Sequence, residues 1–289
     1  MKKTAIAILI AVLVVAIGGG LCFAGLSAVH FDFKKLDRTE YLTRTYDFSD
    51  PIREIDLTCG TADVELIAAE DGRCRVVCFE NERERYAVSN DDGRLTIRRE
   101  TDERGWSLFS FAFKSPKITI SLPAGTYELL QAELSTGDMT ADRALSFDAV
   151  EVKLSTGELV LSGVQTKRLS AHGSTGNIRL SDMAPETVDV SVSTGRIELT
   201  NVVCSGDLRA KSTTGDIRLT DVDALSLYLE ATTGNITGTI RTPKAFSASA
   251  STGKVSVPAG TVSEPNGAFG GPCEARTSTG DIRLSISGE

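Results

Sequence analysis

Residues able to do chemistry are few in this sequence, and they are scattered. Its two histidines, His30 and His172, have no cysteine or carboxylate at the spacing of a metal site. The chain also lacks the glycine-rich frame that cradles phosphates and the Gly-x-Ser-x-Gly turn of a serine nucleophile. We therefore expect no catalytic residues, no metal site and no cofactor, and we predict that the protein is not an enzyme.

Three Gly-Asp pairs, at residues 137–138, 215–216 and 280–281, suggest a different chemistry. Aspartates repeated on successive turns can bind calcium between those turns. Such a site needs an aspartate on every turn, whereas the equivalent position elsewhere holds Arg196 and Lys254. Because a cation at this position would repel calcium, the pattern argues against a calcium ladder.

A polysaccharide-cleaving enzyme would need clustered carboxylates on one face of the protein. Arg179, Glu198 and Arg218 occupy one equivalent position in consecutive repeats. Their alternating charges favour a stabilising ion ladder over a catalytic set. A carbohydrate-active β-helix enzyme is therefore the weaker alternative.

The tripeptide Ser/Thr-Thr-Gly recurs along the second half of the chain, and it determines how these side chains are positioned. Its glycines are Gly137, Gly157, Gly176, Gly195, Gly215, Gly234, Gly253 and Gly280. Successive glycines are 19 or 20 residues apart, except for the last pair, which are 27 apart. The residue two positions after each glycine is always aliphatic, from Met139 to Ile282, and polar residues alternate with apolar ones around it. This period of two indicates half-buried strands on both sides of a glycine corner.

These units predict an all-β fold, a β-solenoid built as a β-helix-like stack of 19–20-residue coils. A unit of this size cannot bury its apolar face alone, so each is expected to stack on the next. Glycine suits the corner because it adopts positive φ readily. The paired Ser/Thr hydroxyls are expected to bond nearby backbone groups there. The insertion at 262–273 is rich in proline and glycine and predicts a surface loop, or else a binding loop.

The chain divides into four predicted parts: 1–29, an anchor or signal segment; 30–46, a linker; 47–131, an irregular β region with the first coils and a cap; and 132–289, the regular repeats. Within the third part, 55–66 resembles a degenerate unit with Gly60 near the corner and with Val64 and Leu66 facing inward. Residues 90–97 predict a hairpin turn that enters a strand.

An aromatic cluster follows these two segments in the sequence. Its residues are Trp106, Phe109, Phe111 and Phe113. Such a cluster could form an exposed contact patch for lipid headgroups or a partner protein. Its strand-like alternation favours a hydrophobic cap on the end of the solenoid instead, and both interpretations stay open.

Residues 4–29 contain no charged side chain, and Lys2 and Lys3 precede them. This length suffices for one transmembrane helix with its N-terminus in the cytoplasm. A cleaved signal peptide is the alternative, although the apolar run is long for one. A lipoprotein site at Cys22 is disfavoured by Leu21 before it. Both main interpretations place residues 30–289 outside the cytoplasm, and we expect a single-pass cell-membrane protein.

The formal net charge is −8, and after residue 29 the chain holds 29 basic and 39 acidic residues. This acidic balance excludes nucleic acid as a partner.

Cys22 lies in the anchor, and five cysteines follow it: Cys59, Cys74, Cys78, Cys204 and Cys273. Cys74 and Cys78 are too far apart along a strand to bridge each other. Either could pair with Cys59, or all five could be small buried hydrophobic residues.

Residues 213–219 read Thr-Thr-Gly-Asp-Ile-Arg-Leu and residues 278–284 read Ser-Thr-Gly-Asp-Ile-Arg-Leu. With the N-terminal anchor, these strings resemble a bacterial envelope family of unknown function named the "putative adhesin" domain, over residues 50–288. The resemblance implies a β-solenoid, a link to envelope stress and surface interactions, and no catalytic residue to carry over. We expect a non-enzymatic, adhesin-like interaction or scaffold protein that binds an envelope protein or a surface glycan. An accessory sensor of an envelope-stress signalling system is the main alternative.

Overall fold

The computed structural model describes residues 13–20, 23, 27, 40–81, 84–100, 115–258 and 271–288. The chain separates into two units, one of Met1–Glu40 with Glu103–Lys114 and one of Tyr41–Asp102 with Ser115–Glu289. In the first unit, residues 13–20 are helical. No helix within the described residues is long and apolar enough to span a membrane. Most of the predicted anchor, 4–29, and the whole aromatic cluster lie outside the described residues.

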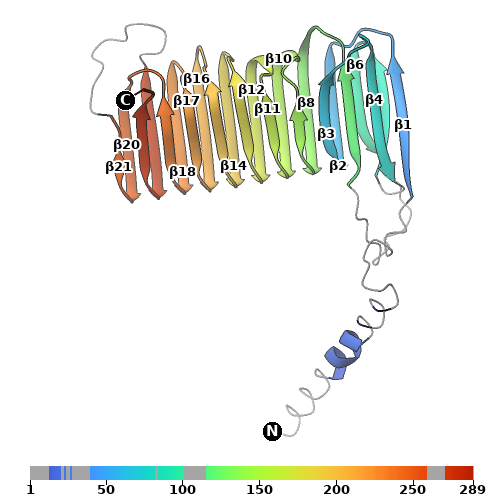
Figure 1. Ribbon diagram of the computed structural model, residues 1–289, viewed down its shortest axis with the longest axis horizontal. Helices are drawn as coiled ribbons and strands as arrows, with labels where there is room; N and C mark the ends of the chain where they lie inside the picture. Colours follow the sequence, from blue (N-terminus) through green and yellow to red (C-terminus); the bar gives the residue numbers. More distant parts are fainter. Residues whose placement is uncertain are drawn as a thin grey trace. The chain divides into compact units, whose positions relative to one another are not determined.

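The second unit consists of β-strands in two sheets (Figure 1). Among the described residues, the larger sheet has 12 strands, which follow one another in space as β1 (Tyr41–Phe48), β4 (Cys74–Asn81), β7 (Lys117–Leu122), β3 (Asp63–Ala68), β9 (Met139–Ala141), β11 (Leu159–Ser162), β13 (Ile178–Met183), β15 (Ile197–Val202), β17 (Ile217–Val222), β19 (Ile236–Ile240), β23 (Ile282–Ile286) and β21 (Val255–Ser256). The predicted linker therefore ends in a strand, since β1 begins at Tyr41.

The smaller sheet has 11 described strands, in this spatial order: β20 (Ala245–Thr252), β22 (Pro272–Thr279), β18 (Ser226–Thr233), β16 (Asp207–Thr214), β14 (Thr187–Thr194), β12 (Gln165–Thr175), β10 (Ser146–Thr156), β8 (Thr126–Thr136), β2 (Glu54–Thr61), β6 (Arg94–Glu100) and β5 (Arg85–Asp91). Each regular repeat contributes one strand to each sheet, and equivalent strands pair in parallel and in register. The predicted all-β solenoid of stacked repeats is confirmed.

At the C-terminal end, the order in which the coils stack differs from their order along the chain. The last coil, β22 with β23, lies between the coil of β18 and β19 and the coil of β20 and β21. The expectation that each repeat stacks on the next is therefore wrong at this end. The 27-residue spacing before Gly280 gives the chain enough length to return past β20 and enter the stack one position earlier. Residues 262–270 of the predicted loop lie outside the described residues, whereas Pro272 and Cys273 already belong to β22.

The N-terminal end shows a similar rearrangement. The coil of β6 and β7 lies outside that of β2 and β3, and the antiparallel strands β1, β4 and β5 complete this end. Thr61 pairs with Thr136, so Ala62 stands at the corner position that Gly137 fills in the next coil, and Gly60 does not. Val64 and Leu66 are buried, as predicted. The predicted hairpin is present between β5 and β6, with positive φ at Asp92 and Gly93.

The core is a column of aliphatic side chains between the two sheets. Ile178, Ile197 and Ile217 come from one sheet and Val190 and Ala210 from the other, and all are at most 1% exposed. Because successive residues of a strand point to opposite faces, burying these positions turns the alternate residues outward. On the outer face of each sheet, equivalent side chains of successive coils therefore form a row that runs from strand to strand. Every second position of the repeat gives one such row.

Candidate functional site

The glycine column sets the geometry of every regular coil. All eight corner glycines have φ between +132° and +150°, a conformation that L-residues rarely adopt. A β-carbon on Gly195 would overlap the carbonyl of Gly176, and the same holds from coil to coil along the column. The Gly195 N–H donates to the carbonyl of Thr214 on the next coil, at 2.8 Å. The eight glycines therefore lie in register along one edge, and they fix the outer rows.

The position after each glycine forms a second column, and it explains the Gly-Asp pairs. The Asp138 carboxylate accepts a hydrogen bond from the Glu158 N–H at 2.8 Å, and the Asp281 carboxylate accepts one from the Lys254 N–H at 2.8 Å. The Asn235 N–H likewise holds the pKa of Asp216 below its ordinary value. These carboxylates therefore satisfy backbone donors between coils. The described residues contain no group of three or more His, Cys, Asp or Glu side chains that could hold a metal ion.

The corner hydroxyls do not behave as predicted. The serine or threonine residues at both positions before each glycine are exposed. Within the described residues, none of them donates a side-chain hydrogen bond to the corner backbone. Ser212 and Thr277, which point inward one residue earlier, bond the carbonyls of Gly195 and Gly234 at 3.3 and 3.0 Å. The reason is geometric, because the corner directs the two preceding side chains toward solvent.

The predicted ion ladder is present in part. Arg179 bonds both Glu158 at 2.6 Å and Glu198 at 2.9 Å, on the coils either side of it. Partial burial opposes ionisation of Glu198, but hydrogen bonds from Arg179 and Arg196 lower its pKa. Arg218 pairs with Asp216 of its own coil instead, at 3.3 Å. These pairs are too exposed to add much stability and do not form a catalytic set.

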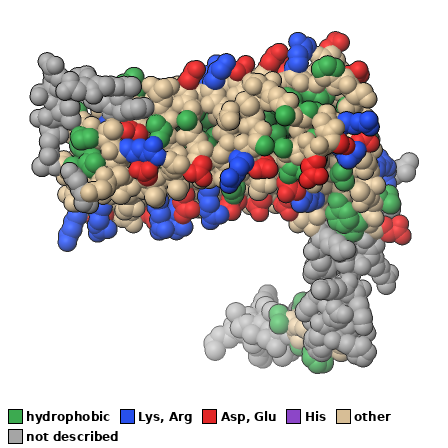
Figure 2. Space-filling model, turned by 45° about the horizontal axis from the view of Figure 1, so that its top comes forward, with side chains coloured by type: hydrophobic (Ala, Val, Ile, Leu, Met, Phe, Trp, Pro, Cys, Tyr) green, Lys and Arg blue, Asp and Glu red, His purple; other side chains and the backbone are tan. Residues whose placement is uncertain are grey.

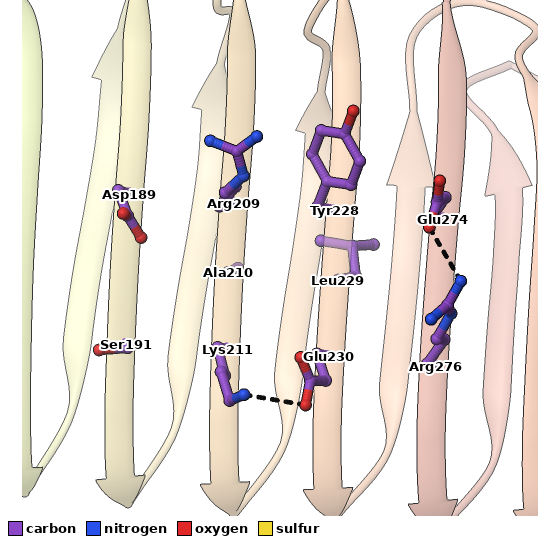
Figure 3. A pocket seen from close by; sticks show the side chains of 10 residues that line it. All are labelled: Asp189, Ser191, Arg209, Ala210, Lys211, Tyr228, Leu229, Glu230, Glu274 and Arg276. Atoms are coloured by element: carbon purple, nitrogen blue, oxygen red, sulfur yellow. Dashed lines mark hydrogen bonds and ion pairs between the residues drawn. The ribbon is translucent and has the colours of Figure 1, made fainter.

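An open groove lies on the outer face of the smaller sheet, over β14, β16, β18 and β22 (Figure 3). We call it the Tyr228 groove, and its volume is about 420 Å³. It is lined by Asp189, Ser191, Arg209, Ala210, Lys211, Tyr228, Leu229, Glu230, Glu274 and Arg276. The outward side chains form two rows across the strands, because in-register parallel pairing places equivalent residues side by side.

Hydrogen bonds and ion pairs hold the side chains of the Tyr228 groove. Lys211 bonds Glu230 at 3.0 Å across two strands, and Arg276 bonds Glu274 at 3.2 Å within one strand. The guanidinium of Arg209 lies 4.9 Å from the centre of the half-buried Tyr228 ring, a cation–π contact. Figure 3 shows that ring between Arg209 and Glu274. The groove thus presents an aromatic ring within a framework of donors and acceptors.

Charge in the Tyr228 groove is balanced. Its lining holds three basic and three acidic side chains, so its formal charge is zero. On the face drawn in Figure 2, Lys/Arg and Asp/Glu side chains are interspersed, and neither sign gathers into one patch. The groove therefore offers no strong field for a polyanion or a polycation.

His172 continues one row of the groove on the neighbouring strand β12. Its Nδ1 lies 2.7 Å from the Ser191 hydroxyl and its Nε2 lies 3.1 Å from the Ser170 hydroxyl. The ring is half-buried on the outer face of the sheet. A histidine between two hydroxyls, with no carboxylate bonded to its ring, lacks the orienting acid of a catalytic triad.

The five cysteines after the anchor are free thiols buried in the core. Burial raises the pKa of Cys59, Cys78, Cys204 and Cys273 to about 12 and that of Cys74 to about 11. A disulfide between Cys59 and Cys74 or Cys78, left open by the sequence, is not formed. These residues pack as small hydrophobic side chains and are poor nucleophiles.

Sequence reasoning missed a buried ion pair near the C-terminal end. Lys244, fully buried, lies 2.7 Å from the carboxylate of Asp223 and donates to the Ala224 carbonyl at 2.6 Å. The Thr242 hydroxyl donates to the same carboxylate at 2.8 Å. Lys244 ends the 241–244 connection from β19 to β20, which must pass the inserted coil. The ion pair therefore stabilises the connection at the place where the coils stack in a different order from their order along the chain.

Sequence reasoning also overlooked Tyr228, although this residue carried a signal. Across the regular repeats, Tyr228 is the one aromatic residue in a row that otherwise reads polar, as in Ser170, Asp189, Arg209 and Glu274. A large apolar ring at an outward position is the kind of residue that marks a contact surface. The predicted contact patch of Trp106, Phe109, Phe111 and Phe113 lies outside the described residues, and its role stays a prediction.

Comparison with known proteins gives both a family and a fold. The sequence pattern of the family described as Toastrack DUF4097 matches residues 52–285, and no curated protein matches the chain. An adhesin candidate from Bacteroides fragilis has a TM-score of 0.54 at 16% identity, over 85% of this chain and 97% of its own. A candidate lipid binding protein from Parabacteroides distasonis has a TM-score of 0.44 at 16% identity, over 86% of this chain and 98% of its own. At 16% identity the likeness to the Bacteroides fragilis structure shows the fold alone. The match of the family pattern over residues 52–285 confirms the family prediction from the sequence.

Proposed function

The chain belongs to the Toastrack DUF4097 family, and from this premise we propose that it is a non-enzymatic, adhesin-like interaction protein that binds its partner through the Tyr228 groove. One observation carries the proposal. Four neighbouring strands present two ordered rows of side chains around an aromatic ring, on a sheet held rigid by parallel pairing on both sides. A preformed surface of this kind suits recognition, since few groups need to be ordered on binding.

The bonding of the groove's carboxylates supports binding over catalysis. Glu230 bonds Lys211, and Glu274 bonds Arg276. Glycoside hydrolysis needs two carboxyl groups that face each other across the scissile bond, one of them protonated. Each of these glutamates is instead paired with a neighbouring cation of the groove, and the two do not form a facing pair of free carboxyl groups. The name of the similar Bacteroides fragilis structure also points to adhesion.

Anchoring in a membrane is part of the proposal, and its support comes from the sequence. Residues 4–29 carry no charge, and two lysines precede them. We propose that this segment holds the chain in the cell membrane, with the β unit outside the cytoplasm. Cell fractionation tests this. The full chain should follow the membrane fraction and resist alkaline extraction, and recovery of intact protein in the soluble fraction would contradict the proposal.

A capture experiment tests the interaction role by asking which molecules of the cell envelope the protein retains. The detergent-solubilised full chain is immobilised and incubated with envelope material, and retained molecules are compared between wild type and Tyr228→Ala. The matched control is Lys153→Ala, because Lys153 is exposed on the same outer face but lies away from the groove. We expect the first variant to lose capture and the control to keep it. Equal capture by both variants would exclude the groove, and capture of a membrane signalling protein would favour the sensor alternative.

A further inference from the structure

The lining of the Tyr228 groove specifies a ligand more closely than the family does. We propose that the groove binds an uncharged polysaccharide chain that runs across the strands, with one sugar ring stacked on Tyr228. The inference rests on the proposed function and adds the chemical class of the ligand. Its basis is the combination of zero formal charge, many free hydrogen-bonding positions and one aromatic ring.

Hydrogen-bonding capacity remains after the groove's own pairs are formed. The Lys211 ammonium carries three N–H donors and Arg276 carries five, while each ion pair occupies only part of that capacity. All four side chains of these two pairs are more than a third exposed. Sugar hydroxyls both donate and accept, so they can bond a carboxylate and its cationic partner together without breaking the pair.

The aromatic ring supplies the apolar part of the site. Tyr228 is half-buried, and Figure 3 shows its ring over β18 with the hydroxyl pointing along the strand. A pyranose has one face rich in C–H groups, which packs against an aromatic ring while the equatorial hydroxyls point sideways toward polar neighbours. Arg209 and Glu274 are those neighbours, in register on the strands either side.

The spacing of the rows suits a polymer. Equivalent side chains on adjacent strands are about 4.8 Å apart, close to the length of one sugar in an extended chain. A chain crossing β14, β16, β18 and β22 would meet one new set of side chains per sugar. Hydroxyl-bearing residues continue the rows beyond the groove at both ends, with Ser170 on β12 and Ser247 and Ser249 on β20.

Other ligand classes fit less well. A peptide that binds by adding a strand needs a free sheet edge, whereas the four groove strands are paired on both sides. Nucleic acid and acidic polymers need a surplus of positive charge, which the groove lacks. A lipid tail needs a continuous apolar surface, and Tyr228 is ringed by charged side chains.

The test measures binding of four hexasaccharides to the full chain in detergent by calorimetry. Three are uncharged, namely cellohexaose, mannohexaose and N-acetylchitohexaose, and hexagalacturonate is the anionic comparison. We expect at least one uncharged probe to bind, with an affinity that changes little between low and high salt because no net charge is neutralised. Tyr228→Ala should weaken it about tenfold or more, which corresponds to about 1.4 kcal/mol. Tyr228→Phe should keep most of the affinity, and Lys153→Ala all of it.

Three results would overturn the inference: no binding of any uncharged probe, tighter and salt-sensitive binding of hexagalacturonate, or equal binding by Tyr228→Ala. Circular dichroism shows whether each variant is folded. If Tyr228→Ala disturbs the packing of the sheet, Tyr228→Phe is the variant that keeps the ring and its packing. The proposed function is judged separately. If Tyr228 is required to capture envelope material but no uncharged probe binds, the ligand class is wrong and the interaction role stands.

Discussion

Replacing Gly195 by alanine would put a methyl group where the backbone of the neighbouring coil already lies. Gly195 has φ +144°, and a β-carbon there overlaps the carbonyl of Gly176. A non-glycine residue held in such a conformation costs about 1–3 kcal/mol. Relieving the overlap would also separate two coils and weaken the Gly176 and Gly195 N–H bonds to Thr194 and Thr214, each worth about 1 kcal/mol. We expect a total loss of about 3–5 kcal/mol in the free energy of unfolding.

Urea denaturation followed by circular dichroism measures this loss, with Gly125→Ala as the matched control. Gly125 has no atom near its potential β-carbon and no positive φ, so alanine fits there. Removing glycine flexibility from the unfolded chain should leave the control neutral or stabilise it by about 0.4–1 kcal/mol. If Gly195→Ala changes the free energy of unfolding by no more than the control does, the steric argument for the glycine column is refuted.

Three further predictions concern buried groups and pH. Lys244→Met should lower the free energy of unfolding by about 3–5 kcal/mol, because it leaves the buried Asp223 without its cationic partner. A change below about 1 kcal/mol in the same urea assay would contradict the role of the pair. In a Cys22→Ser background, the five buried thiols should react with Ellman's reagent at pH near 8 only after denaturation, since burial raises the pKa of Cys204 to about 12; rapid reaction of any of them in the folded protein would show that the core is open. The lowered pKa of Asp216 means that its ionised form stabilises the fold above the ordinary aspartate range and that this contribution is lost as pH falls through the lowered pKa. Asp216→Asn should therefore be less stable than wild type at neutral pH and lose less stability on acidification, and parallel stability-versus-pH curves would count against the hydrogen bond from Asn235.

Most of the regular part of the fold could be predicted because its causes are local. Alternation of apolar and polar residues is a property of one strand, and the need for positive φ at Gly195 or Gly215 is a property of one turn. The repeat of both every 19 or 20 residues then implies that coils stack. The position after the glycine also carried a readable signal, because Asp or Asn recurs there, but its bonding partner is a backbone N–H on another coil.

Two of the errors concern the partner that a residue finds in the folded chain. Thr61 pairs with Thr136, and this register makes Ala62 the corner residue although Gly60 lies two residues away. Arg218 pairs with Asp216 on its own coil and not with Glu198 on the preceding coil. Such choices depend on distances of a few ångströms between segments that the sequence does not place relative to each other.

We could predict the all-β class, the coil length, the glycine corners and the family from the amino-acid sequence, because each follows from local periodicity and composition. We could not predict the order of the end coils, the burial of Lys244 against Asp223 or the assembly of the Tyr228 groove, which depend on how distant segments pack in the folded chain. The reason is that a groove made from four separate coils exists only once parallel strands lie in register. Its equivalent residues on neighbouring strands are about 20 or more positions apart in the chain, and hydrogen bonding between coils brings them side by side.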